Sequence, residues 1–205
     1  MTTLLLVRHG ETPWNREGRV QGWAATGLTD RGHEQAQALG AWLGAAHTVD
    51  RVLASDLERT RVTAATAREA AGGLPEPTLE PSLRERGFGV YQGFPAEEMV
   101  DRFPEYDRSN SILTLDVDPL NGESVEAFLD RVERAWQGVT DAVADGETAV
   151  VVTHGGVLKL VLGMLTDRQP REALGRASPP NCSVTEVRLD GDPELIRFGA
   201  TPWRD

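Results

Sequence analysis

The sequence contains few of the features that secreted, membrane-spanning or nucleic-acid-binding proteins need. Cys182 is the only cysteine, so no disulfide can form within the chain. No run approaches the ~20 apolar residues of a membrane span, and the apolar start is short and lacks the basic residues of a signal peptide. Lys and Arg total 21 against 32 Asp and Glu, giving a net charge of -11. This excess of acid disfavours nucleic acid and membrane surfaces as partners, and we expect a cytoplasmic protein.

What the sequence does contain is an alternation of apolar runs with helical patterns, at a length typical of one domain. The runs at 3–7 and 149–153 are almost continuously apolar, as in strands that are buried on both faces of a mostly parallel sheet. The pattern predicts one α/β domain over residues 1–205, a three-layer α/β/α sandwich. The expected strands are 3–7, 51–54, 149–153, 183–188 and 194–198, and the expected helices are 29–43, 56–71, 124–143 and 157–165.

The segment 88–121 differs from the rest of the chain. It holds both tyrosines and three of the five phenylalanines, and it has no clean period. Irregular segments inserted between regular elements often cover or select a ligand. We therefore predict a lid or specificity region at about 88–121, with Arg86, Arg102 and Arg108 as cations for a second anionic group.

Two histidines follow the two most apolar strands. His9 comes directly after Arg8 at the end of the first run, and His154 ends the run at 149–153. In open α/β sheets, ligands bind beyond the carboxyl ends of the strands, so neighbouring strands would bring the two imidazoles together. Each histidine is followed by a glycine, which allows a sharp turn and a close approach to a bound group.

The sequence resembles the histidine phosphatase superfamily, which is also called the phosphoglycerate mutase-like family. The match is in order along nearly the whole chain, which makes it far more specific than an isolated Arg-His-Gly. The motifs that carry it are Arg8-His9-Gly10-Glu11-Thr12 with Trp14-Asn15, Gln21-Gly22-Trp23, Leu28-Thr29 with Gly32, Ser55-Asp56-Leu57-Glu58-Arg59-Thr60, Leu83-Arg84-Glu85-Arg86, Gly122-Glu123-Ser124, Thr153-His154-Gly155-Gly156 and Asn181 with Ser183-Val184.

The resemblance implies a role for each matching residue. His9 would attack phosphorus and carry the phosphoryl group, and Arg8 and Arg59 would grip its oxygens. His154 would stabilise the transition-state charge. Glu85 would protonate the leaving oxygen and then activate water, with Glu80 and Glu123 as the competing acids.

Asn15, Gln21, Gly22 and Gly155 would complete the phosphate-binding site. The resemblance implies no cofactor and no metal, because the arginines and histidines supply the positive charge. The sequence likewise shows no His/Asp cluster that suggests a metal ion.

These residues predict a metal-independent, histidine acid phosphatase-type phosphomonoesterase that acts on a small phosphorylated metabolite. The alternatives are a phosphoglycerate mutase and an inert module that binds phospho-ligands. Mutases of the family share an adjacent arginine pair and a proline-rich run after the acid, which segment 106–113 lacks, whereas segment 83–93 is mutase-like. An inert module would have lost a reacting residue, and all five are present. A homodimer is expected only because homodimers are the commonest oligomers of soluble proteins.

Overall fold

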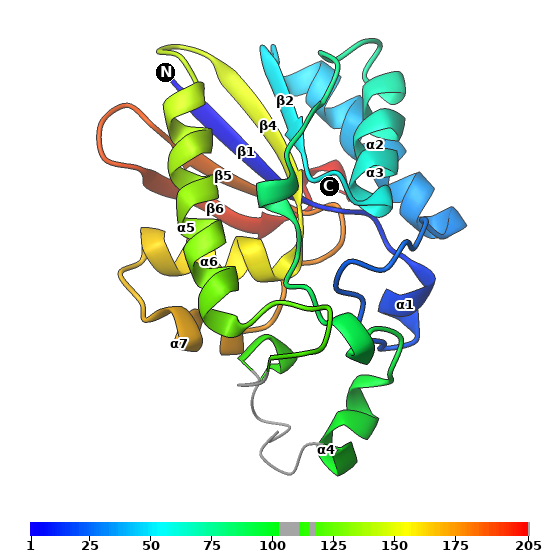
Figure 1. The fold of residues 1–205 in the computed structure, drawn as a ribbon. Helices are drawn as coiled ribbons and strands as arrows, with labels where there is room; N and C mark the ends of the chain where they lie inside the picture. Colours follow the sequence, from blue (N-terminus) through cyan, green and yellow to red (C-terminus); the bar gives the residue numbers. More distant parts are fainter. Residues whose placement is uncertain (103–110, 115–117, 205) are drawn as a thin grey trace.

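A six-stranded sheet forms the centre of the structure, a computed structural model that describes residues 1–102, 111–114 and 118–204, with Val100 described by its backbone alone (Figure 1). Five strands lie within two residues of the predicted ranges. The sixth, β3, was not predicted, since two exposed residues make no pattern. The strands are β1 Thr3–Arg8, β2 Arg51–Ala54, β3 Thr78–Leu79, β4 Thr148–Thr153, β5 Val184–Arg188 and β6 Glu194–Ala200.

The sheet has the order β3-β2-β4-β1-β5-β6. β3, β2, β4 and β1 are parallel to their neighbours, whereas β5 pairs antiparallel with both β1 and β6. β5 is thus the one strand of this sheet that runs against the rest. The central pair, β1 and β4, joins segments about 145 residues apart in the sequence, and both strands end at the same edge of the sheet (Figure 1).

Four long helices cover the two faces of this sheet. α2 Asp30–Ala46 and α3 Glu58–Ala70 lie on one face, and α5 Val125–Ala142 and α6 Gly155–Leu165 lie on the other (Figure 1). Leu5 and Val7 of β1 join the cluster beneath α2 and α3, whereas Leu4 and Leu6 join the cluster beneath α5 and α6. Each fully buried side chain of this kind contributes about 1.5–3 kcal/mol. The predicted three-layer α/β/α sandwich is confirmed.

Local sequence signals fix where the helices begin. Thr29 and Ser124 are N-caps: their hydroxyl oxygens accept hydrogen bonds from the backbone amides three residues later, those of Gly32 and Ala127. α6 begins two residues before its predicted start, directly after the extended backbone of His154. This earlier start places Gly156 in the first turn of α6, where its amide donates to Oε2 of Glu85 at 2.9 Å.

Shorter elements surround the carboxyl edge of the sheet. α1 Pro13–Arg16, α4 Met99–Arg102 and α7 Pro170–Gly175 were not predicted, because four to six residues are too few to show a period. A third apolar cluster joins this region to α5 and α6 and includes Phe88 and Leu113. Residues 103–110 and 115–117 of the predicted lid segment 88–121 lie outside the described residues, so the role of this segment stays a prediction. No helix in the described part of the chain is long and apolar enough to cross a membrane.

Two helix glycines give opposite expectations for stability. A Cβ at Gly40 would collide with the backbone oxygen of Ala67, where α2 packs on α3. A Cβ at Gly138, in α5, would meet no atom within 4 Å. Gly40→Ala should therefore lower the free energy of unfolding by about 1–3 kcal/mol, and Gly138→Ala should raise it by about 0.5–1 kcal/mol. Urea unfolding checks both, and shifts in the same direction would contradict this packing interpretation.

Candidate active site

The pairing of β1 with β4 brings two histidines side by side. Arg8 is in register with Thr153, and the next amide, that of His9, donates to the carbonyl oxygen of Thr153 at 3.0 Å. The ring centroids of His9 and His154 lie 5.3 Å apart, with the planes tilted by 56°. Both side chains are almost fully buried. The structure thus brings together the two imidazoles as the sequence predicts.

The ring of His9 is held in one orientation by its neighbour. Nδ1 lies 2.8 Å from the carbonyl oxygen of Gly10. Because a carbonyl oxygen only accepts, the proton must sit on Nδ1, which leaves the lone pair of Nε2 available. Burial, followed by the charges of Arg59 and Arg8, holds the pKa of His9 well below its usual value. His9 is therefore neutral at pH 7, the state in which an imidazole is nucleophilic.

His154 has one ring nitrogen engaged and one without a partner. Nε2 lies 2.9 Å from Oγ of Ser55, the residue that follows β2. Nδ1 is buried and has no hydrogen-bond partner among the described residues. Burial, followed by the charge of Arg59, holds the pKa of His154 well below its usual value. With the proton on Nδ1, this neutral ring would offer a donor to a bound oxyanion.

Two arginines, the buried Arg59 and the partly buried Arg8, add positive charge beside the histidines. Arg8 is the last residue of β1, and its Nη1 donates to the carbonyl oxygen of Pro179 at 2.7 Å. Arg59, in α3, donates to the carbonyl oxygens of Gly22 at 2.7 Å and Ala24 at 3.3 Å. Burial lowers the pKa of Arg59 to about 10, and burial also lowers the pKa of Arg8. Arginine side chains are not deprotonated in proteins, so both guanidinium groups stay charged at pH 7.

Unpartnered nitrogens gather around His9. Of the five buried side-chain atoms that lack a partner among the described residues, three belong to this site, namely Nε of Arg8, Nε of Arg59 and Nδ1 of His154. An unsatisfied buried polar group costs about 1–3 kcal/mol, and more when it is charged. A bound anion with several oxygens would satisfy such a set, which makes this arrangement suited to phosphate.

Glu85 places a carboxylate beside these cations. Its Oε2 accepts from the amide of Gly156 at 2.9 Å, near the start of α6, and its Oε1 accepts from the amide of Arg86 at 3.1 Å. A Cβ at position 156 would collide with this carboxylate, which explains why the second residue of α6 is glycine. The indole of Trp23 also donates to the backbone oxygen of Glu85 at 2.6 Å.

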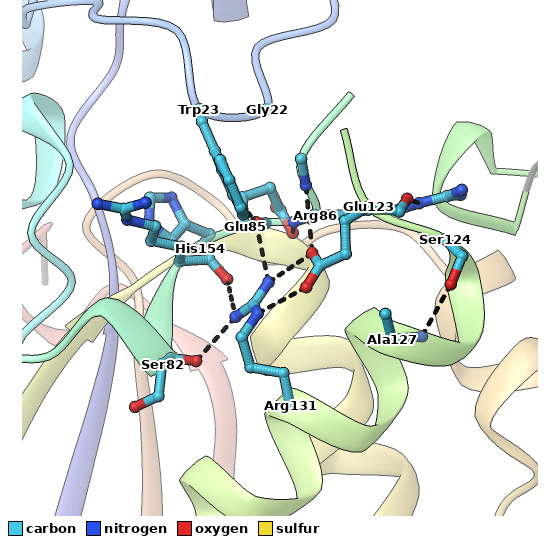
Figure 2. Close-up of polar contacts among 12 residues, drawn as sticks. Gly22, Trp23, Ser82, Glu85, Arg86, Glu123, Ser124, Ala127, Arg131 and His154 are labelled. Atoms are coloured by element: carbon cyan, nitrogen blue, oxygen red, sulfur yellow. Dashed lines mark hydrogen bonds and ion pairs between the residues drawn. The ribbon is translucent and has the colours of Figure 1, made fainter. Parts of the chain in front are cut away.

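The loop that carries Glu85 is fixed by Arg131 of α5, as Figure 2 shows. The guanidinium group donates to the carbonyl oxygens of Ser82, Arg84 and Glu85 at 2.8, 2.8 and 3.1 Å. It also pairs with both carboxylate oxygens of Glu123 at 2.7 and 2.8 Å. Glu123, a competing candidate for the acid, is thus engaged in a largely buried ion pair. Sequence reasoning missed Arg131, because its partners lie in a loop 46–49 residues away.

The predicted phosphate-binding residues lie around the same site. Asn15 Oδ1 accepts from the amide of Thr12 at 3.2 Å and from Nδ2 of Asn181 at 3.3 Å, which turns its own Nδ2 toward other acceptors. Gln21 Oε1 accepts from the hydroxyl of Thr12 at 3.0 Å. Gly22 has a φ of +52°, the left-handed region that favours glycine, and its carbonyl oxygen holds Arg59.

These residues surround a cavity of about 210 Å³. Eight of the nine predicted site residues line it, and the ninth, His154, is fully buried with its ring 5.3 Å from that of His9. Sequence reasoning missed further residues of its wall, which include Arg19, Ser111, Lys159 and Ser178. A larger hollow of about 430 Å³ beside α5 is lined by neither histidine. Within the described ranges no group of three or more His, Cys, Asp or Glu could hold a metal ion.

Comparisons with known proteins agree with this geometry. The sequence model of the histidine phosphatase superfamily (branch 1) matches residues 4–201. The chain is 38% identical to phosphoglycerate mutase-like protein 4 of Arabidopsis thaliana, over 98% of this chain and 84% of that protein. It is 35% identical to the metal-independent phosphoserine phosphatase of the same plant, over 92% and 77%.

Solved structures give the same family. YhfR of Bacillus stearothermophilus superposes with a TM-score of 0.85 at 30% identity, with full coverage of both chains. The alpha-ribazole phosphatase of Shigella flexneri superposes with a TM-score of 0.80 at 28% identity, covering 97% of this chain and 96% of that one. Since the match spans nearly every residue and includes the paired histidines, the chain belongs to the histidine phosphatase superfamily.

Proposed function

We propose that the chain is a metal-independent phosphomonoester hydrolase that works through a phosphohistidine on His9. The observation that carries the proposal is the neutral, oriented imidazole of His9 beside the guanidinium groups of the buried Arg59 and the partly buried Arg8. A nucleophile and fixed positive charge in one small cavity are what phosphoryl transfer requires. The fixed cations perform the charge stabilisation that metal ions supply in other phosphoryl-transfer enzymes, and one relative is named a metal-independent phosphatase.

The first step forms the phosphoenzyme. Nε2 of His9 bonds to phosphorus while the bond from phosphorus to the ester oxygen breaks, and Glu85 gives its proton to that oxygen. Arg8, Arg59 and Nδ1–H of His154 stabilise the charge on the non-bridging oxygens. The alcohol then leaves.

The second step returns the enzyme to its starting state. A water molecule attacks phosphorus, Glu85 takes one of its protons, and the bond between phosphorus and Nε2 breaks to release inorganic phosphate. In a mutase, a hydroxyl of the substrate would take the phosphoryl group instead. Phosphate release and isomerisation of phosphoglycerate, assayed side by side with chelator present, distinguish the two reactions and test metal independence.

Replacement of His9 tests the nucleophile. His9→Ala should abolish both hydrolysis of p-nitrophenyl phosphate and acid-labile labelling of the protein by a ³²P-phosphomonoester, since no other group accepts the phosphoryl. His33→Ala removes a histidine that does not line the cavity, so this variant should keep both the hydrolysis and the labelling. Acid-labile labelling that persists in His9→Ala would contradict the assignment.

Replacement of Glu85 tests the general acid. An alkoxide leaving group needs a proton, whereas a nitrophenolate does not. Glu85→Gln should therefore slow the hydrolysis of alkyl phosphates by about 10²–10⁴-fold and slow the hydrolysis of p-nitrophenyl phosphate far less. Glu80→Gln is the matched control, because Glu80 lines the hollow beside α5 and not this cavity. Steady-state kcat/KM on both substrate classes gives the answer, and equal slowing of the two would assign the acid elsewhere.

The lowered pKa values of His9 and His154 predict how stability depends on pH. Below the ordinary histidine pKa of about 6.5, the unfolded chain binds protons that the folded chain does not. The free energy of unfolding should therefore fall as pH decreases from about 6.5, by at most about 1.4 kcal/mol per histidine for each pH unit. Urea unfolding at pH 7.5, 6.5 and 5.5 measures the slope. His154→Asn should reduce it, and an unchanged slope would show that His154 is protonated in the folded protein.

A further inference from the structure

Trp23 lies against the loop that carries the acid. This acid loop comprises residues 84–87, and Figure 2 shows Trp23 beside Glu85. The indole Nε1 of Trp23 donates to the backbone oxygen of Glu85 at 2.6 Å. The guanidinium carbon of Arg84 lies 5.1 Å from the centre of the indole ring, and a Cβ at Gly87 would lie 3.0 Å from Cε2 of that ring. One side chain therefore contacts the acid loop before, at and after Glu85.

Two features of the acid loop fit it to this ring. Arg84 forms a bidentate ion pair with Asp56 at 2.6 and 2.5 Å, which keeps its guanidinium group over the indole, where the π electrons attract a cation. Gly87 is not in the left-handed region, so the nearness of the ring, and not the backbone conformation, excludes a larger residue there. Trp23 is 36% exposed, so these contacts do not serve chiefly to bury apolar surface.

The backbone around Trp23 holds the arginine that we assign to the phosphoryl oxygens. Arg59 donates to the carbonyl oxygens of Gly22 at 2.7 Å and Ala24 at 3.3 Å, the residues before and after Trp23. The amide of Trp23 donates to Oε1 of Gln92 at 2.6 Å, which fixes this segment further. The segment thus contacts Arg59 through its carbonyl oxygens and the acid loop through the indole.

The cations that the sequence suggests for a second anionic group have other contacts. Arg86, in the acid loop, is fully buried and donates to the carbonyl oxygens of Glu123 and Leu113, both at 3.1 Å. Arg102 lies 3.9 Å from the centre of a phenylalanine ring, and Arg108 lies outside the described residues. Arg86 therefore ties the acid loop to neighbouring segments of the protein.

The backbone oxygen of Glu85 accepts from two donors in different parts of the molecule. Arg131, at 3.1 Å, ties it to α5, whereas Trp23 ties it to the segment that holds Arg59. A general acid must lie within about 2.6–3.2 Å of the oxygen that it protonates, and a displacement of about 1 Å can slow a reaction by about 10²-fold. The contact with Trp23 is the one that relates Glu85 to a phosphoryl group bound at Arg59.

We propose that Trp23 is a positioning residue, which holds the general acid Glu85 in place relative to the phosphoryl group that Arg59 binds. This inference rests on the proposed hydrolase function and adds a residue to its machinery. Trp23 does not line the cavity of His9, so it acts through Glu85 and not on the substrate. Loss of its hydrogen bond should therefore affect the steps in which Glu85 transfers a proton.

Two esters of similar size test this role. Benzyl phosphate leaves as an alkoxide, which needs the proton of Glu85, whereas p-nitrophenyl phosphate leaves as a nitrophenolate, which does not. The ratio of kcat/KM for the first over the second reports phosphoenzyme formation, because both esters share the later hydrolysis of the phosphoenzyme. Trp23→Phe keeps an aromatic ring and removes the donor, so this ratio should fall by about 3- to 10-fold.

A matched control removes the same kind of donor elsewhere. Trp203 donates from its indole to the carbonyl oxygen of Cys182 at 2.9 Å and does not line the cavity. Trp203→Phe should therefore leave the ratio for the two esters unchanged. A fall in the ratio as large as that in Trp23→Phe would mean that any lost indole donor has this effect, and it would overturn the proposal.

The same substitution without the acid separates positioning from general damage. In the Glu85→Gln background there is no acid to position, so adding Trp23→Phe should not lower the ratio further. A further fall in this background overturns the proposal. Equal slowing of both esters by Trp23→Phe alone also overturns it and leaves Trp23 with a packing role.

A second variant decides if Trp23→Phe does not fold. Gly87→Ala keeps the indole but adds a Cβ that would lie 3.0 Å from its ring, so it should displace Trp23 and lower the same ratio; an unchanged ratio overturns the proposal. A wild-type protein that hydrolyses neither ester rejects the hydrolase function and this inference with it. An active wild type with an unchanged ratio in folded Trp23→Phe rejects the inference alone.

Discussion

The site depends on the pairing of β1 with β4. The amide of His9 donates to the carbonyl oxygen of Thr153, one position beyond the last paired residues of the two strands. A slip of one residue in this register would send every side chain of β1 to the opposite face of the sheet. The alternation of Leu4 and Leu6 with Leu5 and Val7 opposes such a slip, because each pair fills a different core cluster. The apolar core on both faces therefore fixes how the two imidazoles meet.

The site also concentrates groups that a folded core would ordinarily avoid. A buried and a partly buried guanidinium group lie beside two neutral histidines, and nitrogens of three of these residues lack partners among the described residues. Each such group costs stability in the free protein. The gain appears when an anion enters, because the donors are already in place and need no reorganisation. The loop that carries Glu85 is held from the other side, where Arg131 binds three of its carbonyl oxygens and Glu123.

How far the sequence predicts this molecule depends on how local each signal is. Continuous apolar runs identified β1 and β4, and helical patterns that begin at residues 29 and 124 located the starts of α2 and α5. Ordered motifs identified all nine candidate site residues, eight of which line one cavity. The contacts of Arg131 were missed because they join residues remote in sequence. Lys159 was missed because it interrupts an apolar helix, where a single cation in the sequence indicates no particular partner.

The acidity of the chain and the basic cavity are compatible because charge acts over a short range in salt water. At physiological ionic strength the interaction between exposed charges is screened over about 8 Å, so the net charge of -11 has little effect inside the cavity. The charges of Arg59 and Lys159, which are buried, and of Arg8, which is partly buried, are screened far less. An acidic surface opposes binding of long polyanions, which would touch many exposed carboxylates. A small phosphomonoester reaches into the cationic cavity, so an acidic chain and a phosphate-binding site are compatible.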